Sequence, residues 1–239
     1  MITNVIFDVD GTLVDSNDFH AQAWQKAFEK FGKPVELKDI RAQIGKGGDQ
    51  LMPVFLSEEE INEFGKELEK TRGEIFKNDF LPRVQTFPEA RTLMAKMVAD
   101  GKRIAIASSA HPDELDHFKE LLGIEDFLDA ETSAEDVEES KPEPDVFVAA
   151  LKELGNPSPE QTVVIGDSPY DAIAARKIGL QTIGLLCGGF DEEWLKQEGC
   201  AEIFQDPGDL LAKYDNSLLC CNDVVKPKTL SDVVGSLLV

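Results

Sequence analysis

Residues 8–16 read Asp8-Val9-Asp10-Gly11-Thr12-Leu13-Val14-Asp15-Ser16 and directly follow a short apolar run at residues 5–7. Such a run, ending abruptly in polar residues, is typical of a buried strand. Two acids separated by one residue, with a glycine directly after them, put two carboxylates on a sharply turning loop. One carboxylate could attack an electrophile while the other moves protons. An ordinary polar turn or a calcium loop is the alternative explanation of this stretch taken alone.

Short apolar runs recur along the rest of the chain, and most are followed by a helical pattern. The strand candidates are residues 5–7, 103–107, 162–165 and 181–186, with weaker ones at 128–131 and 202–204. The alternation predicts an α/β fold, a Rossmann-like parallel sheet with helices on both faces. Ligands of such sheets bind beyond the carboxyl ends of the strands. We therefore expect Asp8, Ser108 and Asp167, which each follow a predicted strand, to converge on one site.

Residues 17–84 interrupt this pattern, because they carry helical periodicity without an intervening strand. We predict a small inserted α-helical domain at 17–84 and a core formed by residues 1–16 and 85–216. Ser57 and Glu60 form a capping box that opens a charged helix running toward Phe76. One helical face of the insertion is apolar and is expected to be buried: Ala23, Trp24, Ala27, Phe28 and Phe31. Residues 217–239 form an extension of unknown role, expected to pack on the core as a helix or strand.

Three later stretches place reactive side chains after predicted strands or before predicted helices. Ser108 ends a strand shortly before Pro112, which suits the first position of a helix. Lys141 precedes a helical run at 145–154 and offers a cation beside a phosphoryl group. Asp167 and Asp171 lie four residues apart, an arrangement of hard oxygens that suits magnesium. Separately, these residues also fit a helix cap, a surface lysine and two acids at a helix start.

In this order the four stretches resemble the motifs of the haloacid dehalogenase superfamily of phosphotransferases, over the chain up to about residue 215. The insertion resembles the α-helical cap of the subgroup that contains phosphoglycolate phosphatase and beta-phosphoglucomutase. The resemblance implies that Asp8 is the nucleophile and Asp10 the general acid and base. It implies Ser108 and Lys141 as ligands of the phosphoryl group. It also implies Mg²⁺ as the cofactor, bound by the residues Asp8, Asp10 (through its backbone carbonyl) and Asp167, with Asp171 in support.

Substrate contacts are expected from both parts of the chain. Thr12 and Ser109 belong to the first two motifs, and we expect them to bind substrate there. In the insertion, His20 and Lys46 resemble positions that reach the substrate in this subgroup. Lys46 lies in the stretch Ile44-Gly45-Lys46-Gly47-Gly48-Asp49, whose glycines suggest a flexible loop. A packing histidine and a surface lysine are the alternative interpretations.

The favoured function is a Mg²⁺-dependent phosphatase that hydrolyses a small phosphorylated metabolite, of the phosphoglycolate or sugar phosphate class, through an aspartyl-phosphate intermediate. The alternative is a phosphosugar mutase similar to beta-phosphoglucomutase. A phosphonatase or a non-catalytic binding relative is less favoured. The pair Gly166-Asp167 departs from the Glu-Asp pair that the resemblance associates with the mutase, which favours hydrolysis.

Composition limits the partners. The net charge of −22 repels nucleic acid and anionic membrane surfaces, so we expect neither as a partner. No apolar stretch approaches the roughly 20 residues of a membrane span. The four cysteines show no zinc spacing and are expected to be reduced, and no leader is apparent, so the protein is expected to be cytoplasmic. We expect a small phosphate ester as substrate and a monomer or homodimer.

Overall fold

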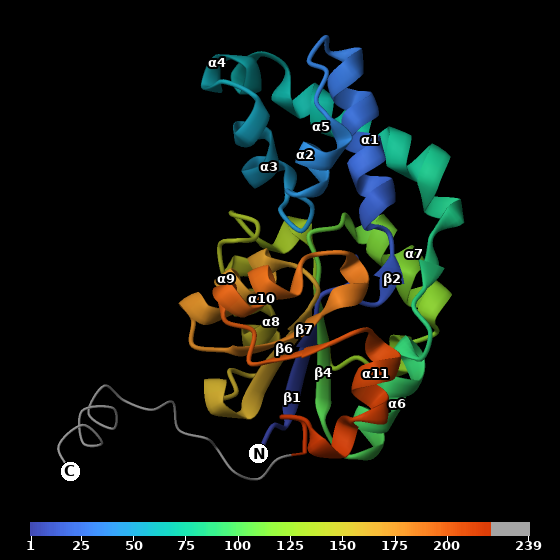
Figure 1. Ribbon diagram of the computed structural model, residues 1–239, viewed down its shortest axis with the longest axis vertical. Helices are drawn as coiled ribbons and strands as arrows, with labels where there is room; N and C mark the ends of the chain where they lie inside the picture. The colour runs from blue at the N-terminus through green and yellow to red at the C-terminus, as the bar shows by residue number, and fades with distance from the viewer. Residues whose placement is uncertain (221–239) are drawn as a thin grey trace, which may run out of the picture.

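A six-stranded parallel sheet forms the centre of the protein, of which a computed structural model describes residues 1–220 (Figure 1). The spatial order of the strands is β5-β4-β1-β6-β7-β8. Their bounds are β1 Asn4–Phe7, β4 Arg103–Ala107, β5 Ala130–Thr132, β6 Thr162–Gly166, β7 Gln181–Leu185 and β8 Glu202–Phe204. Because all neighbouring pairs are parallel, the six carboxyl ends lie at one edge of the sheet. The predicted Rossmann-like α/β fold is confirmed.

Helices cover both faces of the sheet. Successive side chains of a strand point to opposite sides, so each strand can contribute to an apolar cluster on either face. In β1, Val5 and Phe7 join one apolar cluster, whereas Ile6 joins another. The first cluster includes residues of α6 (Ala90–Ala99), α7 (Pro112–Leu122) and α11 (Pro207–Ala212). The second includes residues of α8 (Asp145–Glu153) and α9 (Pro169–Lys177), and α10 (Glu192–Glu198) packs beside α9.

Four strands differ from their predicted bounds: β1 begins one residue earlier, β6 ends one residue later, and β5 and β7 differ for local reasons. The strand predicted at 128–131 begins at Ala130 and runs to Thr132. Its delayed start has a cause, because the carboxylate of Asp129 accepts a hydrogen bond from the Ile104 backbone N–H at 2.9 Å just before the ladder begins. The strand predicted at 181–186 ends one residue early, since Leu186 opens a short 3₁₀ turn.

The insertion consists of helices joined by short loops and lies beyond the carboxyl edge of the sheet (Figure 1). An antiparallel ribbon of two short strands, β2 (Val14–Asp15) and β3 (Gln85–Thr86), joins its two ends and was not predicted. Its helices are α1 Asn17–Lys30, α2 Leu37–Arg41, α3 Gly48–Phe55, α4 Glu58–Glu60 and α5 Lys66–Ile75. The capping box of Ser57 and Glu60 is confirmed. The helix that it opens continues through two π-helical segments, Ile61–Gly65 and Phe76–Phe80.

The apolar face predicted on the first helix is buried, although Phe31 at its end is only partly so. Near the end of the described chain, Leu219 is buried and its carbonyl accepts a hydrogen bond from Lys102 Nζ at 2.7 Å. Most of the predicted terminal extension, residues 221–239, lies outside the described residues. In the described part, Cys187, Cys200 and Cys220 are free thiols. None of the helices there is long and apolar enough to cross a membrane.

Candidate active site

Three buried carboxylates gather at the carboxyl edge of the sheet. Asp8 follows β1, Asp167 follows β6, and Asp171 lies in the first turn of α9. One oxygen of each carboxylate lies within 4.8 Å of the others. Their side chains are almost fully buried, with at most 3% of any residue exposed. The predicted convergence of Asp8 and Asp167 thus agrees with the positions of both side chains.

Lys141 is the cation of this cluster. Its Nζ donates to Asp8 Oδ1 at 2.6 Å and to Asp171 Oδ1 at 2.9 Å, and the residue is 1% exposed. Asp171 Oδ2 accepts from the backbone N–H and the hydroxyl of Ser168, which caps α9. Both oxygens of Asp171 therefore have partners. Asp171 holds Lys141 in place and fixes the start of α9 at the same time.

One lysine does not balance three buried carboxylates. Burial and the neighbouring carboxylate of Asp171 raise the pKa of Asp167 to about 7, and burial is the main cause that raises the pKa of Asp8. Burial by itself would lower the pKa of Lys141, but Asp171 and Asp8 raise it. Oxygen-rich sites with excess negative charge suit hard divalent cations. The cluster could therefore bind a metal ion.

Thr12 and Asn17 hold the carboxylate of Asp167 by hydrogen bonds. The Thr12 hydroxyl donates to Asp167 Oδ1 at 3.1 Å, and Asn17 Nδ2 donates to Oδ2 at 2.8 Å. Sequence reasoning expected Thr12 to bind substrate, whereas its hydroxyl lies against this carboxylate. Asn17 was missed, although it is the first residue of α1. Gly11, at φ +76°, leaves room for the hydrogen bond between Asn17 and Asp167, because a Cβ there would collide with both side chains.

Asp10 has its own partners, away from the three-carboxylate cluster. The Ser16 hydroxyl donates to Asp10 Oδ1 at 2.5 Å, and His20 Nε2 lies 2.8 Å from the same oxygen. The His20 ring stacks on Phe76 at 3.9 Å between centroids. Burial would raise the pKa of Asp10, but the charge and hydrogen bond of His20 and the bond from Ser16 lower it. Sequence reasoning assigned His20 to the substrate, and it missed this contact with Asp10.

A small cavity of about 50 Å³ opens beside these residues and joins the core to the insertion. Asp8, Asp10 and Lys141 line it, as do His20 and Ser109. Its other lining residues are Trp24, Ile44, Gly45, Lys46, Gly47, Arg72, Ala110 and Glu114. A cavity of this size is suited to a phosphoryl group rather than to a whole metabolite.

Two predicted site residues have other contacts. Ser108 is fully buried, and its hydroxyl accepts a hydrogen bond from the Ala110 backbone N–H at 3.0 Å, so it shapes the turn that carries Ser109. Lys46 lines the small cavity, donates to Gln43 Oε1 at 2.6 Å and lies over the Tyr170 ring, 4.8 Å from its centroid. Burial lowers the pKa of Lys46.

The glycines beside Lys46 pack closely against their neighbours. A Cβ at Gly47 would collide with the side chain of Ser140 in the core. A Cβ at Gly48 would collide with Glu69 in α5. Glycine at these positions lets the loop approach its neighbours, and the flexibility expected of the loop stays a prediction.

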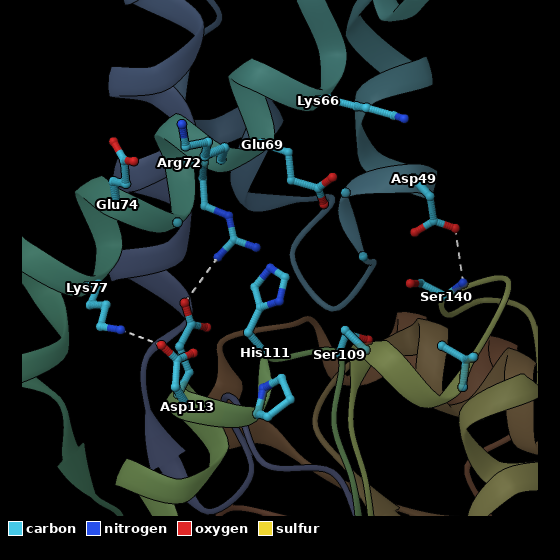
Figure 2. Close-up of a pocket in the computed structure, with 18 of the residues that line it drawn as sticks. Asp49, Lys66, Glu69, Arg72, Glu74, Lys77, Ser109, His111, Asp113 and Ser140 are labelled. Atoms are coloured by element: carbon cyan, nitrogen blue, oxygen red, sulfur yellow. Dashed lines mark hydrogen bonds and ion pairs between the residues drawn. The ribbon is translucent and has the colours of Figure 1, made fainter.

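A wider cleft of about 820 Å³ adjoins the small cavity (Figure 2). It lies between α5 of the insertion and the start of α7 in the core, and the loop before α3 borders it. Gly47, Arg72, Ser109 and Glu114 line both spaces. The two spaces therefore meet at these residues, and a molecule with one end beside Asp8 could extend into the cleft.

Comparisons with known proteins agree with this arrangement. The model of the haloacid dehalogenase-like hydrolase family matches residues 5–185. The chain is 30% identical to Protein SUPPRESSOR OF QUENCHING 1, chloroplastic, of Arabidopsis thaliana, over 97% of this chain but 23% of that protein. It is 27% identical to the Phosphorylated carbohydrates phosphatase of Thermotoga maritima, over 75% of this chain and 82% of that protein. A crystal structure of a hydrolase from Pseudomonas syringae has a TM-score of 0.82 at 28% identity, covering 90% of this chain and 98% of its own. The chain therefore belongs to the haloacid dehalogenase-like hydrolase family, as its four motifs predicted.

Proposed function

We propose that this protein is a Mg²⁺-dependent phosphatase that hydrolyses a small phosphorylated metabolite through an aspartyl-phosphate on Asp8. It is a phosphoric monoester hydrolase by its family and by relatives such as the Phosphorylated carbohydrates phosphatase. The observation that carries the proposal is the position of Asp8, whose carboxylate contacts Lys141 at 2.6 Å and borders the small cavity. A nucleophile beside a buried cation, with Asp10 two residues away on the same turn, suits displacement at phosphorus.

The proposed metal ligands are the carboxylates of Asp8 and Asp167 and the backbone carbonyl of Asp10, with Asp171 in support. The fit rests on the buried carboxylates, which lack enough cationic partners among residues 1–220. Bound Mg²⁺ supplies positive charge that lets two anions, the carboxylate and the phosphate ester, approach each other.

In the first half-reaction, an Asp8 oxygen forms a bond to phosphorus while the bond from phosphorus to the leaving oxygen breaks. Asp10 gives its proton to that oxygen. In the second half-reaction, ionised Asp10 takes a proton from water, whose oxygen attacks phosphorus and releases Asp8 as a carboxylate. His20, 2.8 Å from Asp10 Oδ1, stabilises the ionised form that this second step uses.

The other predicted residues take supporting roles in this proposal. Lys141 and Ser108 bind the phosphoryl oxygens and Ser109 borders them, whereas Thr12 holds the carboxylate of Asp167. Residues 17–84 act as the cap that determines specificity, with Lys46 facing the substrate from its loop. A core of residues 1–16 and 85–216 carries the catalytic groups. Cytoplasmic location, a monomeric or homodimeric state and the absence of a nucleic-acid partner stay predictions.

The test is to follow phosphate release by the full chain from a panel of phosphate esters, including the aryl ester p-nitrophenyl phosphate. Release is expected with Mg²⁺ and is expected to stop in excess chelator. Full activity in chelator would end the metal proposal. In a second assay, beta-glucose 1-phosphate is supplied with a trace of glucose 1,6-bisphosphate. Rapid formation of glucose 6-phosphate without free phosphate would show that the protein acts as a mutase and not as a phosphatase.

A further inference from the structure

Two buried charged residues meet where the small cavity joins the wide cleft. Arg72 comes from α5 of the insertion and is 8% exposed, whereas Glu114 comes from α7 of the core and is 3% exposed. Arg72 Nη1 lies 4.0 Å from Glu114 Oε1, a pair joined by a dashed line at Arg72 in Figure 2. This distance is too long for a hydrogen bond. The two side chains attract each other across the boundary between insertion and core without completing a contact.

Both side chains keep unused hydrogen-bonding capacity. Among the residues that the structure describes, Arg72 Nε and Nη1 and Glu114 Oε2 have no hydrogen-bond partner. Buried charged groups without partners are costly and are rare in folded proteins. Arg72 is also held in position, because its guanidinium lies over the Trp24 ring at 5.3 Å. Both residues line the small cavity and the wide cleft, so their unpaired atoms lie in the wall of a space that a ligand can enter.

The position of this pair relates it to the substrate. Arg72 and Glu114 line the small cavity together with Asp8 and Lys141, and they also line the wide cleft. If the phosphoryl group lies beside Asp8, the remainder of the ester has to pass these two side chains to reach the cleft. The pair is thus placed to contact the atoms next to the scissile bond.

The chemistry of the pair selects among leaving groups. Arginine only donates hydrogen bonds, and an ionised glutamate only accepts them. A hydroxyl group does both, so neighbouring hydroxyls can accept from Arg72 and donate to Glu114. A carboxylate or second phosphate could pair with Arg72, but it has no proton for Glu114 and would be repelled by it.

The charges along the cleft also disfavour a substrate with a second anionic group. Its lining carries six acids, Asp49, Glu69, Glu74, Asp113, Glu114 and Glu138. It carries four side chains that are always or usually cationic, Lys66, Lys70, Arg72 and Lys77. One cation and one acid of this lining, Lys77 and Asp113, already form an ion pair with each other. A cleft with more acids than cations disfavours a second anionic group.

We propose that Arg72 and Glu114 together recognise the leaving group, and that this group is uncharged and polyhydroxylated, as in a sugar or polyol phosphate. The inference rests on the proposed phosphatase function and narrows its substrate class. Arg72 donates to hydroxyl oxygens of the substrate, and Glu114 accepts from a neighbouring hydroxyl. The same pair rejects small carboxylate-bearing esters such as phosphoglycolate.

The test compares kcat/KM for glucose 6-phosphate, phosphoglycolate and p-nitrophenyl phosphate. The wild-type value is expected to be at least about tenfold higher for glucose 6-phosphate than for phosphoglycolate. Arg72→Met is expected to lower kcat/KM for glucose 6-phosphate, relative to that for p-nitrophenyl phosphate, by about tenfold or more. Glu114→Gln keeps the shape but removes the charge. It is therefore expected to raise kcat/KM for phosphoglycolate, relative to that for glucose 6-phosphate, by about tenfold. Arg72→Lys, which keeps the charge, should recover part of the loss.

Lys77→Met and Glu74→Gln are the matched controls, because they change charges on the same cleft away from the small cavity. They are expected to change these ratios by less than about twofold. Preference of the wild type for phosphoglycolate would overturn the proposal, as would unchanged ratios in both Arg72→Met and Glu114→Gln. If Arg72→Met does not fold, as judged by circular dichroism, Arg72→Lys and Glu114→Gln decide the matter.

A failure of the phosphatase function itself would look different, because no ester, including the aryl one, would release phosphate. Calorimetric titration of glucose 6-phosphate and phosphoglycolate in the presence of Mg²⁺ then tests recognition without turnover. Tighter binding of glucose 6-phosphate that Arg72→Met weakens by about tenfold would support the role of the pair. Equal binding of both esters by wild type and variant would overturn it.

Discussion

Replacing Lys141 with methionine removes the only cation that contacts the carboxylate cluster within residues 1–220. Methionine has nearly the same length but no charge, so Asp8 and Asp171 each lose an ion pair. Both carboxylates stay buried, at 3% and 0% exposure. Removing one partner of a buried pair typically costs about 3–5 kcal/mol, because the remaining charge has no compensation. We expect Lys141→Met to lower the free energy of unfolding by that amount at neutral pH in the absence of metal.

The loss should depend on pH in a definite direction. Burial and Asp171 raise the pKa of Asp167 in the folded protein from 3.8 to about 7. A raised folded pKa adds stability that is fully present below about pH 4 and is lost as the pH rises through about 7. Lys141 lowers the pKa of Asp8 and of Asp167, so without it these two carboxylates hold protons still more tightly. The deficit of Lys141→Met should therefore be largest above about pH 7 and should shrink as the pH falls toward about 5.

Urea unfolding of both proteins at about pH 8 and about pH 5, in excess chelator, measures this deficit without stabilisation by bound metal. Lys177→Met is the control, because this half-exposed lysine pairs with Glu143 on the surface at 2.6 Å. Surface pairs contribute under about 1 kcal/mol. A deficit for Lys141→Met no larger than that of the control, or one that is the same at both pH values, would refute the role assigned to Lys141.

Three further changes test the proposed chemistry. Asp8→Asn should abolish turnover and leave the thermal unfolding midpoint at least as high as in the wild type, because the amide removes one of three crowded charges; residual turnover above a few per cent would exclude Asp8 as the nucleophile. With an activated aryl ester, Asp10→Ala should accumulate phosphoenzyme, and equal rates of formation and hydrolysis in rapid quench would contradict this. His20→Asn removes the main cause that lowers the pKa of Asp10, so the acid limb of the pH–rate profile should move to higher pH; an unmoved limb would separate His20 from Asp10.

The sheet could be predicted from sequence because its strands are buried on both faces. Residues 103–107 and 202–204 were predicted with the bounds that the structure has. Continuous apolar runs leave little freedom for a different register or position. The ribbon of β2 and β3 could not be predicted in this way, since each strand has two residues and no periodicity is visible over that length.

The convergence of Asp8 and Asp167 could be predicted for a different reason. Asp8 and Asp167 follow strands whose carboxyl ends share one edge, so finding the strands also brings these residues together. The partners of these residues were harder to find. Asn17 looks like an ordinary helix-start residue, and its hydrogen bond to Asp167 depends on the angle at which α1 leaves the core. Arg72 and Glu114 lie on two helices far apart in sequence, and only the packing of insertion against core brings them together.

The two unforeseen contacts of α1 have a common consequence. Asn17 donates to Asp167, a proposed metal ligand, and His20 lies against Asp10, the proposed acid and base. Both belong to the first turn of the helix that opens the insertion, while their partners belong to the core. The position of α1 therefore determines the orientation of one carboxylate and the pKa of the other. Since Arg72 of α5 and Glu114 of α7 also meet across this boundary, the fit between insertion and core controls both the chemistry and the choice of leaving group in our proposal.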